Sequence, residues 1–234
     1  MAARFGFWAA LVALAASVGY GVPQIMQVMG LLPDPLDRIL IFAPSLVLAP
    51  AFVLTMTALH QNTEPTRRIW SLAGLALSIL YAGLVSIVYV TQLGVVIPRE
   101  GLGTAAEVAI LKCCDTGAFM TAVDLLGYTT MSLATLFAAP AIVGNGVNLW
   151  ARGAFVANGL LAPFLIAQLA WPQLIYVGAL WLITFPLSML LLMLVFARGG
   201  ERIAGRVFRW RSARETECPS NRRTSSSSLR HPGS

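Results

Sequence analysis

Residues 70–97 read WSLAGLALSILYAGLVSIVYVTQLGVVI, an apolar run that contains no charged side chain. About 20 apolar residues in an α-helix cross a hydrocarbon core about 30 Å thick, so this run is long enough to span a bilayer. Five further apolar runs flank it, at about residues 5–29, 35–59, 116–143, 154–170 and 174–196. The sequence therefore predicts an all-α integral membrane bundle of six transmembrane helices.

The composition supports the same fold class. Hydrophobic residues make up 57% of the chain and charged residues 11%, more apolar surface than a soluble globule of this size covers. We expect residues 1–198 to form the six-span transmembrane domain and residues 199–234 to form a basic, Ser-rich, partly disordered cytoplasmic tail. Because the spans use almost the whole chain, we expect no separate soluble catalytic domain.

The positions of the basic residues predict the orientation. If both termini are cytoplasmic, the inner side receives the tail cluster together with Arg4, Arg67, Arg68 and Arg152, and the outer side receives only Arg38, Arg99 and Lys112. Short cytoplasmic loops carry an excess of Lys and Arg, which favours this arrangement. The bias to arginine over lysine is typical of GC-rich bacterial genomes, so we predict a multi-pass protein of the bacterial cytoplasmic membrane.

The first part of the tail has an amphipathic pattern. Three apolar residues recur at helical spacing on one face, and three arginines occupy the other. Such a helix lies on an anionic membrane surface, so the expected partners are the lipid bilayer and anionic lipid head groups, with no nucleic acid. The candidate head-group contacts are Arg202, Arg206, Arg209 and Trp210. The alternative is an ordinary solvated stop-transfer cluster.

Asp124 is an acidic residue well inside a predicted span, unlike Asp37, which lies at the start of the second. An aspartate near the bilayer centre costs about 2.5–3.5 kcal/mol on insertion scales, so it should face the bundle interior and have a partner. At helical spacing it shares a face with Tyr128, and the preceding span carries a polar stripe that includes Tyr81, Tyr89 and Gln92. Two such stripes on consecutive antiparallel spans are expected to face each other.

This polar seam has two interpretations. In the first, its residues line a ligand or proton path in which Asp124 takes up and releases a proton; the candidates are Asp124, Tyr128, Tyr89, Gln92 and Tyr81. In the second, tyrosine and glutamine satisfy the aspartate, and the seam only holds two helices together. The sequence favours the second, and with it a non-catalytic scaffold, sensor or assembly subunit. A small-solute or proton-linked transporter or channel is the alternative, and an integral-membrane enzyme is the third candidate.

Motifs for enzymes and metal sites are missing from the sequence. It contains no HExxH zinc motif and no GxSxG nucleophile elbow. Cys113 and Cys114 are adjacent and Cys218 is in the tail; this odd number without CxxC spacing argues against a metal site or a redox pair. We therefore expect no cofactor, no metal and no catalytic residue.

Two proline-containing segments resemble each other. Residues 48–52 read LAPAF in the second run, and residues 161–164 read LAPF in the fifth. They occupy the middle spans of two possible three-helix halves, a pattern found in transporters built from inverted repeats. Proline kinks are also common in unrelated membrane helices.

Several stretches resemble a group of small, uncharacterised multi-pass bacterial membrane proteins of unknown function. They are Pro44-Ser-Leu, Leu59-His60, residues 81–93 (YAGLVSIVYVTQL), Asp124-Leu-Leu-Gly-Tyr128, Leu136-Phe137 and Ala157-Asn-Gly159-Leu. The resemblance covers the second to fifth spans. It implies a six-span bacterial protein and attaches no activity, ligand or site residue.

Overall fold

The computed structural model describes the backbone of residues 1–115 and 117–216, with side chains described up to residue 199. Every regular element in these ranges is helical. Six of the helical stretches are long and apolar enough to cross a membrane: Ala2–Val28, Leu36–Asn62, Pro65–Gly101, Phe119–Ala141, Val147–Ala167 and Pro172–Gly199. The predicted six-span helical bundle is confirmed.

The first three spans are long helices. They are formed by α1 (Ala2–Val28), α2 (Leu36–Asn62) and α3 (Arg68–Thr91), with the short 3₁₀ turn η1 (Pro65–Arg67) before α3. The third span continues through a π-helical segment, η2 (Gln92–Val96), into α4 (Ile97–Gly101). Both prolines inside α2, Pro44 and Pro50, are accommodated without interrupting the helix.

The second half of the chain is more broken. It contains, in order, η3 (Ala105–Leu111), α5 (Phe119–Ala138), η4 (Ala139–Ala141), α6 (Val147–Gly159), α7 (Ala162–Ala167), η5 (Pro172–Leu174), α8 (Ile175–Gly178) and α9 (Trp181–Thr216). The fifth span begins at Val147 and not near residue 154, and it is divided between α6 and α7 just before Pro163. Proline removes a helical N–H and clashes with the preceding turn, which accounts for the break.

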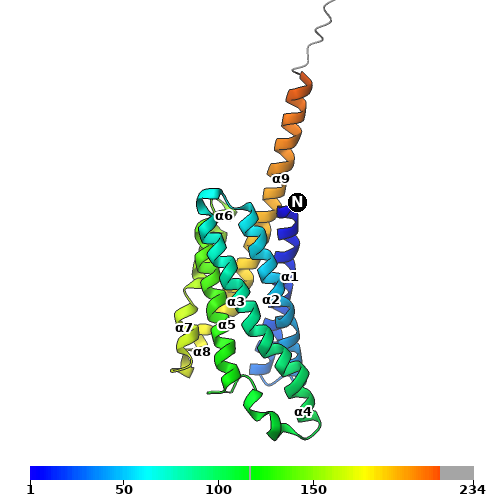
Figure 1. Cartoon of the computed structure of the whole chain (residues 1–234), viewed down its shortest axis with the longest axis vertical. Coiled ribbons are helices and arrows are strands. Elements are labelled where there is room, and N and C mark those ends of the chain that lie inside the picture. The colour runs from blue at the N-terminus through cyan, green and yellow to red at the C-terminus, as the bar shows by residue number, and fades with distance from the viewer. Residues whose placement is uncertain (116, 217–234) are drawn as a thin grey trace, which may run out of the picture.

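The helix of the sixth span continues past the span. The span was expected to end near residue 196 and ends at Gly199, whereas the backbone of α9 is helical to Thr216, beyond the end of the bundle (Figure 1). Arg202, Arg206, Arg209 and Trp210 lie on this continuation, and their side chains fall outside the described part of the structure. Head-group contact by these residues stays a prediction.

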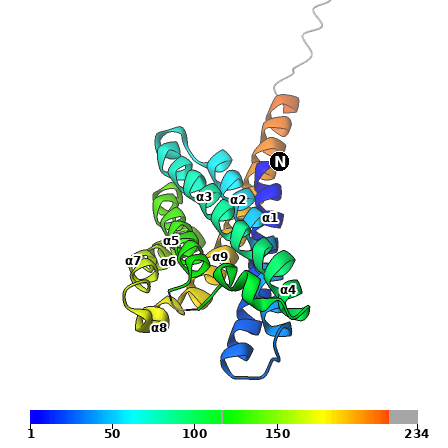
Figure 2. The same cartoon turned by 60° about the horizontal axis from the view of Figure 1, so that its bottom comes forward.

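The six spans form a closed ring. In sequence order, α1 packs on α2, α2 on α3, α3 on α5, α5 on α6 and α6 on α9, and α9 returns to pack on α1. Figures 1 and 2 show this arrangement from two directions. We call the end that carries the N-terminus and the α9 continuation the tail end, and the opposite end, which carries α4 and α8, the loop end (Figure 1). The segment from 102 to 115, at the loop end, is called the Cys loop.

The outward faces of the helices are apolar. Large exposed hydrophobic side chains follow the outer faces of α1, α3 and α9, among them Phe5, Trp8, Val12, Ile79, Leu80, Ile87, Ile183, Leu187 and Leu190. An apolar surface of this extent is the one that contacts lipid, because helices satisfy their own backbone and leave only side chains to face the hydrocarbon.

Aromatic and sulfur-containing side chains fill the middle of the ring. Phe52 of α2 lies edge-on against Tyr81 of α3, with ring centroids 5.9 Å apart, and against Phe185 of α9 at 5.3 Å. Three methionines, Met56, Met131 and Met189, are fully buried with them. We call Phe52, Phe185 and these three methionines the apolar plug.

Small residues let neighbouring helices approach closely. A Cβ added at Gly74 of α3 would lie 2.8 Å from both the carbonyl oxygen of Ala134 and the Cβ of Ala138. The same atom added at Gly83, further along the same helix, would meet nothing within 4 Å. Close approach of α3 to α5 therefore depends on Gly74, as expected for small residues at membrane helix interfaces.

Gly74→Ala should lower the stability of the detergent-solubilised protein by about 1–3 kcal/mol, the usual cost of overpacking. Gly83→Ala, the matched control on the same helix, should be neutral or gain up to about 1 kcal/mol from helix propensity. The midpoint of thermal loss of the monodisperse chromatographic peak measures both effects. Equal midpoints for the two variants would contradict the close packing at Gly74.

Candidate functional site

A cluster of polar aromatic side chains lies inside the ring near the loop end. The hydroxyl groups of Tyr89, from α3, and Tyr128, from α5, are hydrogen-bonded at 2.9 Å. The ring of Tyr81 lies 6.5 Å from that of Tyr128, and Trp181, the first residue of α9, packs edge-on against Tyr128 at 5.0 Å. Tyr20 of α1 contacts Trp181 at 5.7 Å. The predicted seam between the third and fourth spans therefore forms, and α1 and α9 add to it.

Several buried polar atoms of this region have no partner. The hydroxyl of Tyr81, the indole Nε1 of Trp181 and Oδ1 of Asp124 are buried and make no hydrogen bond to the described residues. Asp124 precedes Tyr128 by one helical turn, so the two side chains share a face of α5. Buried polar groups are nearly always satisfied in folded proteins, so these three atoms are positions where a water or another polar group can bind.

Gln92 plays a different part from the one expected. Its amide nitrogen donates to the carbonyl oxygen of Leu111 at 2.7 Å, and its Oε1 accepts from the backbone N–H of Cys113 at 3.0 Å. The side chain is fully buried, and these two bonds resemble one rung of a β-ladder. Gln92 therefore holds the Cys loop against η2, and it does not partner Asp124 as the structural interpretation assumed.

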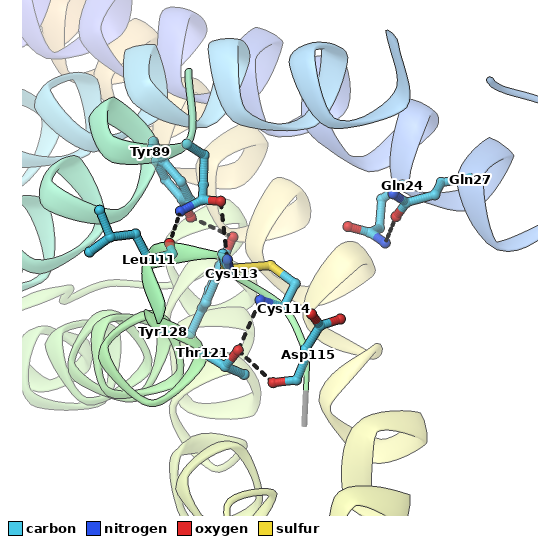
Figure 3. Close-up of a disulfide and its surroundings, with 10 residues drawn as sticks. Gln24, Gln27, Tyr89, Leu111, Cys113, Cys114, Asp115, Thr121 and Tyr128 are labelled. Atoms are coloured by element: carbon cyan, nitrogen blue, oxygen red, sulfur yellow. Dashed lines mark hydrogen bonds between the residues drawn. A yellow bond between two sulfur atoms is a disulfide. The ribbon is translucent and has the colours of Figure 1, made fainter. Parts of the chain in front are cut away.

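The Cys loop brings its two cysteines together. Cys113 and Cys114 form a disulfide between adjacent residues, shown as the yellow bond in Figure 3. The backbone N–H of Cys114 donates to Oγ1 of Thr121 at 2.8 Å, and the Thr121 hydroxyl donates to the carbonyl oxygen of Asp115 at 2.8 Å (Figure 3). Cys113 is buried and Cys114 is exposed, so the pair lies at the boundary of the bundle interior.

The notion that spacing alone decides whether cysteines pair did not anticipate this bond. The expectation of no redox pair depended on the absence of CxxC spacing, but adjacent cysteines can bond when the backbone between them turns tightly. Here Cys114 has φ 78°, in the left-handed region that is uncommon for a residue with a Cβ. Hydrogen bonds with Gln92 and Thr121 hold this turn. The spacing of the cysteines in the sequence gives no information about these tertiary contacts.

Asp124 completes a cluster with the two cysteines. A carboxylate oxygen of Asp124 and the sulfur atoms of Cys113 and Cys114 all lie within 4.8 Å of one another, a spacing at which three ligands can share one metal ion. The sequence predicted no metal-ligating residue. It assigned the two cysteines to the connection between the third and fourth spans and Asp124 to the polar seam, so nothing indicated that they approach each other.

Ion pairs organise the rest of the loop end. Arg38 lies 2.6 Å from Asp34 and 2.6 Å from Glu100, and Lys112 lies 3.7 Å from Glu100. The remaining pair joins Arg99 to Glu107 at 3.3 Å. Each cation that the topology assigns to the outer side is thus paired with a carboxylate. These pairs connect the start of α2 to α4 and to the Cys loop.

A second buried polar group lies between α5, α6 and α9. Asn158 of α6 donates to Oγ1 of Thr135 at 3.1 Å and accepts from the Thr184 hydroxyl at 2.9 Å. It is fully buried, and both ends of its amide are used. Interhelical hydrogen bonds of this kind are worth about 0.6 kcal/mol on average in membrane bundles. Asn158 therefore acts as a structural tie.

Sequence reasoning found part of this site. It identified Asp124 and the three tyrosines, but it missed Trp181, Cys113 and Cys114 as members. Trp181 is an unmarked residue in an apolar run, and no local signal shows that its indole turns inward. The adjacency of the two cysteines was the available signal, and it was interpreted by spacing alone.

Comparison with known proteins adds no assignment. No protein-family model matches the chain, and no curated protein or solved structure matches it.

Gln92→Ala should loosen the Cys loop, because it leaves the Cys113 N–H and the Leu111 carbonyl without their partner. An unsatisfied buried backbone group costs about 1–3 kcal/mol. Hydrogen exchange followed by mass spectrometry should show faster exchange at the Cys113 amide. The thermal midpoint of the detergent-solubilised protein should also fall. Thr91→Ala is the matched control, since the exposed Thr91 hydroxyl bonds only to Ile87 of its own helix. Unchanged exchange in Gln92→Ala would contradict the role assigned to this side chain.

Proposed function

We propose that this protein is a non-catalytic membrane receptor or sensor subunit that takes up a small polar ligand or ion from the loop side. The observation that carries the proposal is the set of unpartnered polar atoms, Tyr81 OH, Trp181 Nε1 and Asp124 Oδ1, at one end of a bundle whose middle is closed. A ligand that supplies hydrogen bonds or charge would satisfy them.

The apolar plug favours a protein that binds its ligand from one side over one that lets a solute pass through the bundle. Phe52 packs against Tyr81 of the site, Phe185 packs against Phe52 and stacks on Trp181, and both phenylalanines are fully buried. The buried methionines Met56 and Met189 continue this packing toward the tail end. A polar solute would have to displace well-packed aromatic and methionine side chains to continue, and such packing is costly to disrupt.

Charge asymmetry supports a cytoplasmic tail end. Among the described residues, the tail end carries Arg4, Arg67, Arg68, Arg152 and Arg198 against the acid Glu64. The cations of the loop end are neutralised by neighbouring carboxylates, as described above. Short loops with an excess of Lys and Arg stay on the cytoplasmic side of a membrane, which favours the tail end as the cytoplasmic end. The Cys loop would then face the outside of a bacterial cell.

A proton-linked or small-solute transporter is the second candidate. It is favoured by the interruptions in the helices: the π-helical segment η2 in the third span and the break between α6 and α7 in the fifth. Discontinuous helices accompany substrate sites in many transporters. The repeat pairing suggested by the two proline segments is weaker, since α2 is continuous through Pro50 whereas the fifth span is broken before Pro163.

Cysteine accessibility distinguishes the two candidates. In a background with Cys113, Cys114 and Cys218 replaced by serine, Asp124→Cys should react with a membrane-impermeant methanethiosulfonate added to the loop side of oriented vesicles. Ser188→Cys, beside the plug and fully buried, should react from neither side. Glu64→Cys, exposed at the tail end, is the positive control for reagent on that side.

Two outcomes would count against the receptor. If Ser188→Cys reacts with reagent from the tail side, the bundle opens both ways and the transporter is supported. If Asp124→Cys is unreactive from both sides, the site is closed and no ligand enters it from the loop end. Each variant is first required to elute as the monodisperse parent does.

The orientation is tested separately with reporter fusions. A fluorescent protein that folds only in the cytoplasm should be bright at both the N-terminus and the C-terminus, because an even number of spans returns the chain to its starting side. Alkaline phosphatase inserted after Gly103, in the Cys loop, should be active only if that loop is outside. A bright reporter at one terminus only would contradict the six-span topology.

A further inference from the structure

We propose that Cys113, Cys114 and Asp124 form, after reduction of the disulfide, a three-ligand site for a thiophilic divalent cation of the zinc class. The proposal rests on the proposed loop-side binding site and names the chemical class of an ion for its Asp124 end. It joins Asp124, a ligand or proton path candidate in the sequence, with two cysteines to which the sequence assigned no ligand.

The distances fit one shared ion. All three ligand atoms lie within 4.8 Å of one another. Two ligands of a tetrahedral Zn²⁺ with bonds of about 2.3 Å lie about 3.8 Å apart, so the cluster has the required size once the sulfur–sulfur bond is opened. Three protein ligands leave the fourth position of a tetrahedral ion free, the arrangement of open zinc sites.

The donor set selects the metal class. Two thiolates favour soft and borderline ions over Mg²⁺ or Ca²⁺, while one carboxylate is tolerated by Zn²⁺ and Cd²⁺. Oδ1 of Asp124 is buried and has no hydrogen-bond partner among the described residues, so it is an acceptor that no other group uses. A bound cation would satisfy this atom and supply the opposite charge that a carboxylate inside a membrane protein needs.

The supporting contacts hold the ligands in place before an ion arrives. Gln92 bonds to the backbone on either side of Lys112, and its contact with the Cys113 N–H fixes the first cysteine. Thr121 accepts from the Cys114 N–H, and it lies on the same helix as Asp124. Partners of this kind orient metal ligands, and losing one usually weakens metal affinity about 10- to 100-fold.

The redox step balances with a thiol reductant. Two electrons and two protons from a dithiol reduce the Cys113–Cys114 bond to two thiols, and the dithiol becomes a disulfide. The cation then displaces the two thiol protons as two Zn–S bonds form, because the thiolate is the ligating form. The oxidised pair offers no thiolate, so the disulfide and the metal complex exclude each other.

Metal binding is tested on the full-length protein in detergent. After treatment with a phosphine reductant and removal of excess reagent, the protein should retain about one Zn²⁺ per chain, and Cd²⁺ should give a thiolate charge-transfer absorption. The same protein left oxidised should bind neither ion, a control that involves no substitution.

Variants identify the ligands. Cys113→Ser, Cys114→Ser and Asp124→Asn should each weaken Zn²⁺ binding by more than about tenfold, since each removes a direct ligand. Asp124→Glu, which keeps the carboxylate, should recover part of the affinity. Cys218→Ser, which removes the thiol of the tail sequence, and Asp115→Asn, which removes the exposed acid next to Cys114, are the matched controls.

Three results would overturn the proposal: equal Zn²⁺ binding by the oxidised and reduced protein, unchanged affinity in Asp124→Asn, or loss of binding in Cys218→Ser. None of them depends on the accessibility experiment. If Zn²⁺ binds as expected but Ser188→Cys reacts from the tail side, the site stands and the one-sided receptor fails. If the vesicle experiment succeeds and Zn²⁺ does not bind, the receptor stands and its ligand is of another class.

Discussion

Hydrocarbon around the helices is the constraint on which the rest of the structure depends. Water cannot satisfy a polar side chain at that depth, so each one turns inward or bonds to its own helix backbone. Many threonines and serines take the second course; Thr55, for example, donates to the carbonyl of Ala51 at 2.8 Å. The larger polar side chains cannot, and they collect inside the ring. Closure of α9 onto α1 gives them a common interior.

The polar group around Asn158 and the loop-end cluster differ in how completely their polar atoms are hydrogen-bonded. Asn158 uses both ends of its amide to join α5 and α9, so its nitrogen and its oxygen each have a partner. The loop-end cluster contains one complete bond, between Tyr89 and Tyr128, beside unpartnered atoms on Tyr81, Trp181 and Asp124. Both groups face the same solvent constraint, and the loop-end atoms without a partner are the place where the proposed ligand would bind.

The Cys loop connects this cluster to the membrane surface. Gln92 at the π-helical end of the third span and Thr121 at the start of α5 hold the loop by its backbone. Ion pairs among Arg38, Glu100 and Lys112 fix its surroundings. The loop thereby places one buried and one exposed sulfur atom beside Asp124. Oδ1 of Asp124 is buried without a hydrogen-bond partner among the described residues, and this acid takes no part in the ion pairs of the loop end.

The sequence by itself determined the solvent, the number of spans and the polar faces of the third and fourth, because apolar length and helical periodicity are local properties of a chain in lipid. Helix ends were less certain: the fifth span begins earlier than its apolar run suggests, since Val147 starts the helix directly after a glycine turn. Only the tertiary structure decided that Trp181 joins the tyrosines, that Gln92 supports a loop, and that two cysteines approach Asp124. These contacts arise when separate elements pack around a common interior, and no periodicity along one segment encodes where another segment will lie.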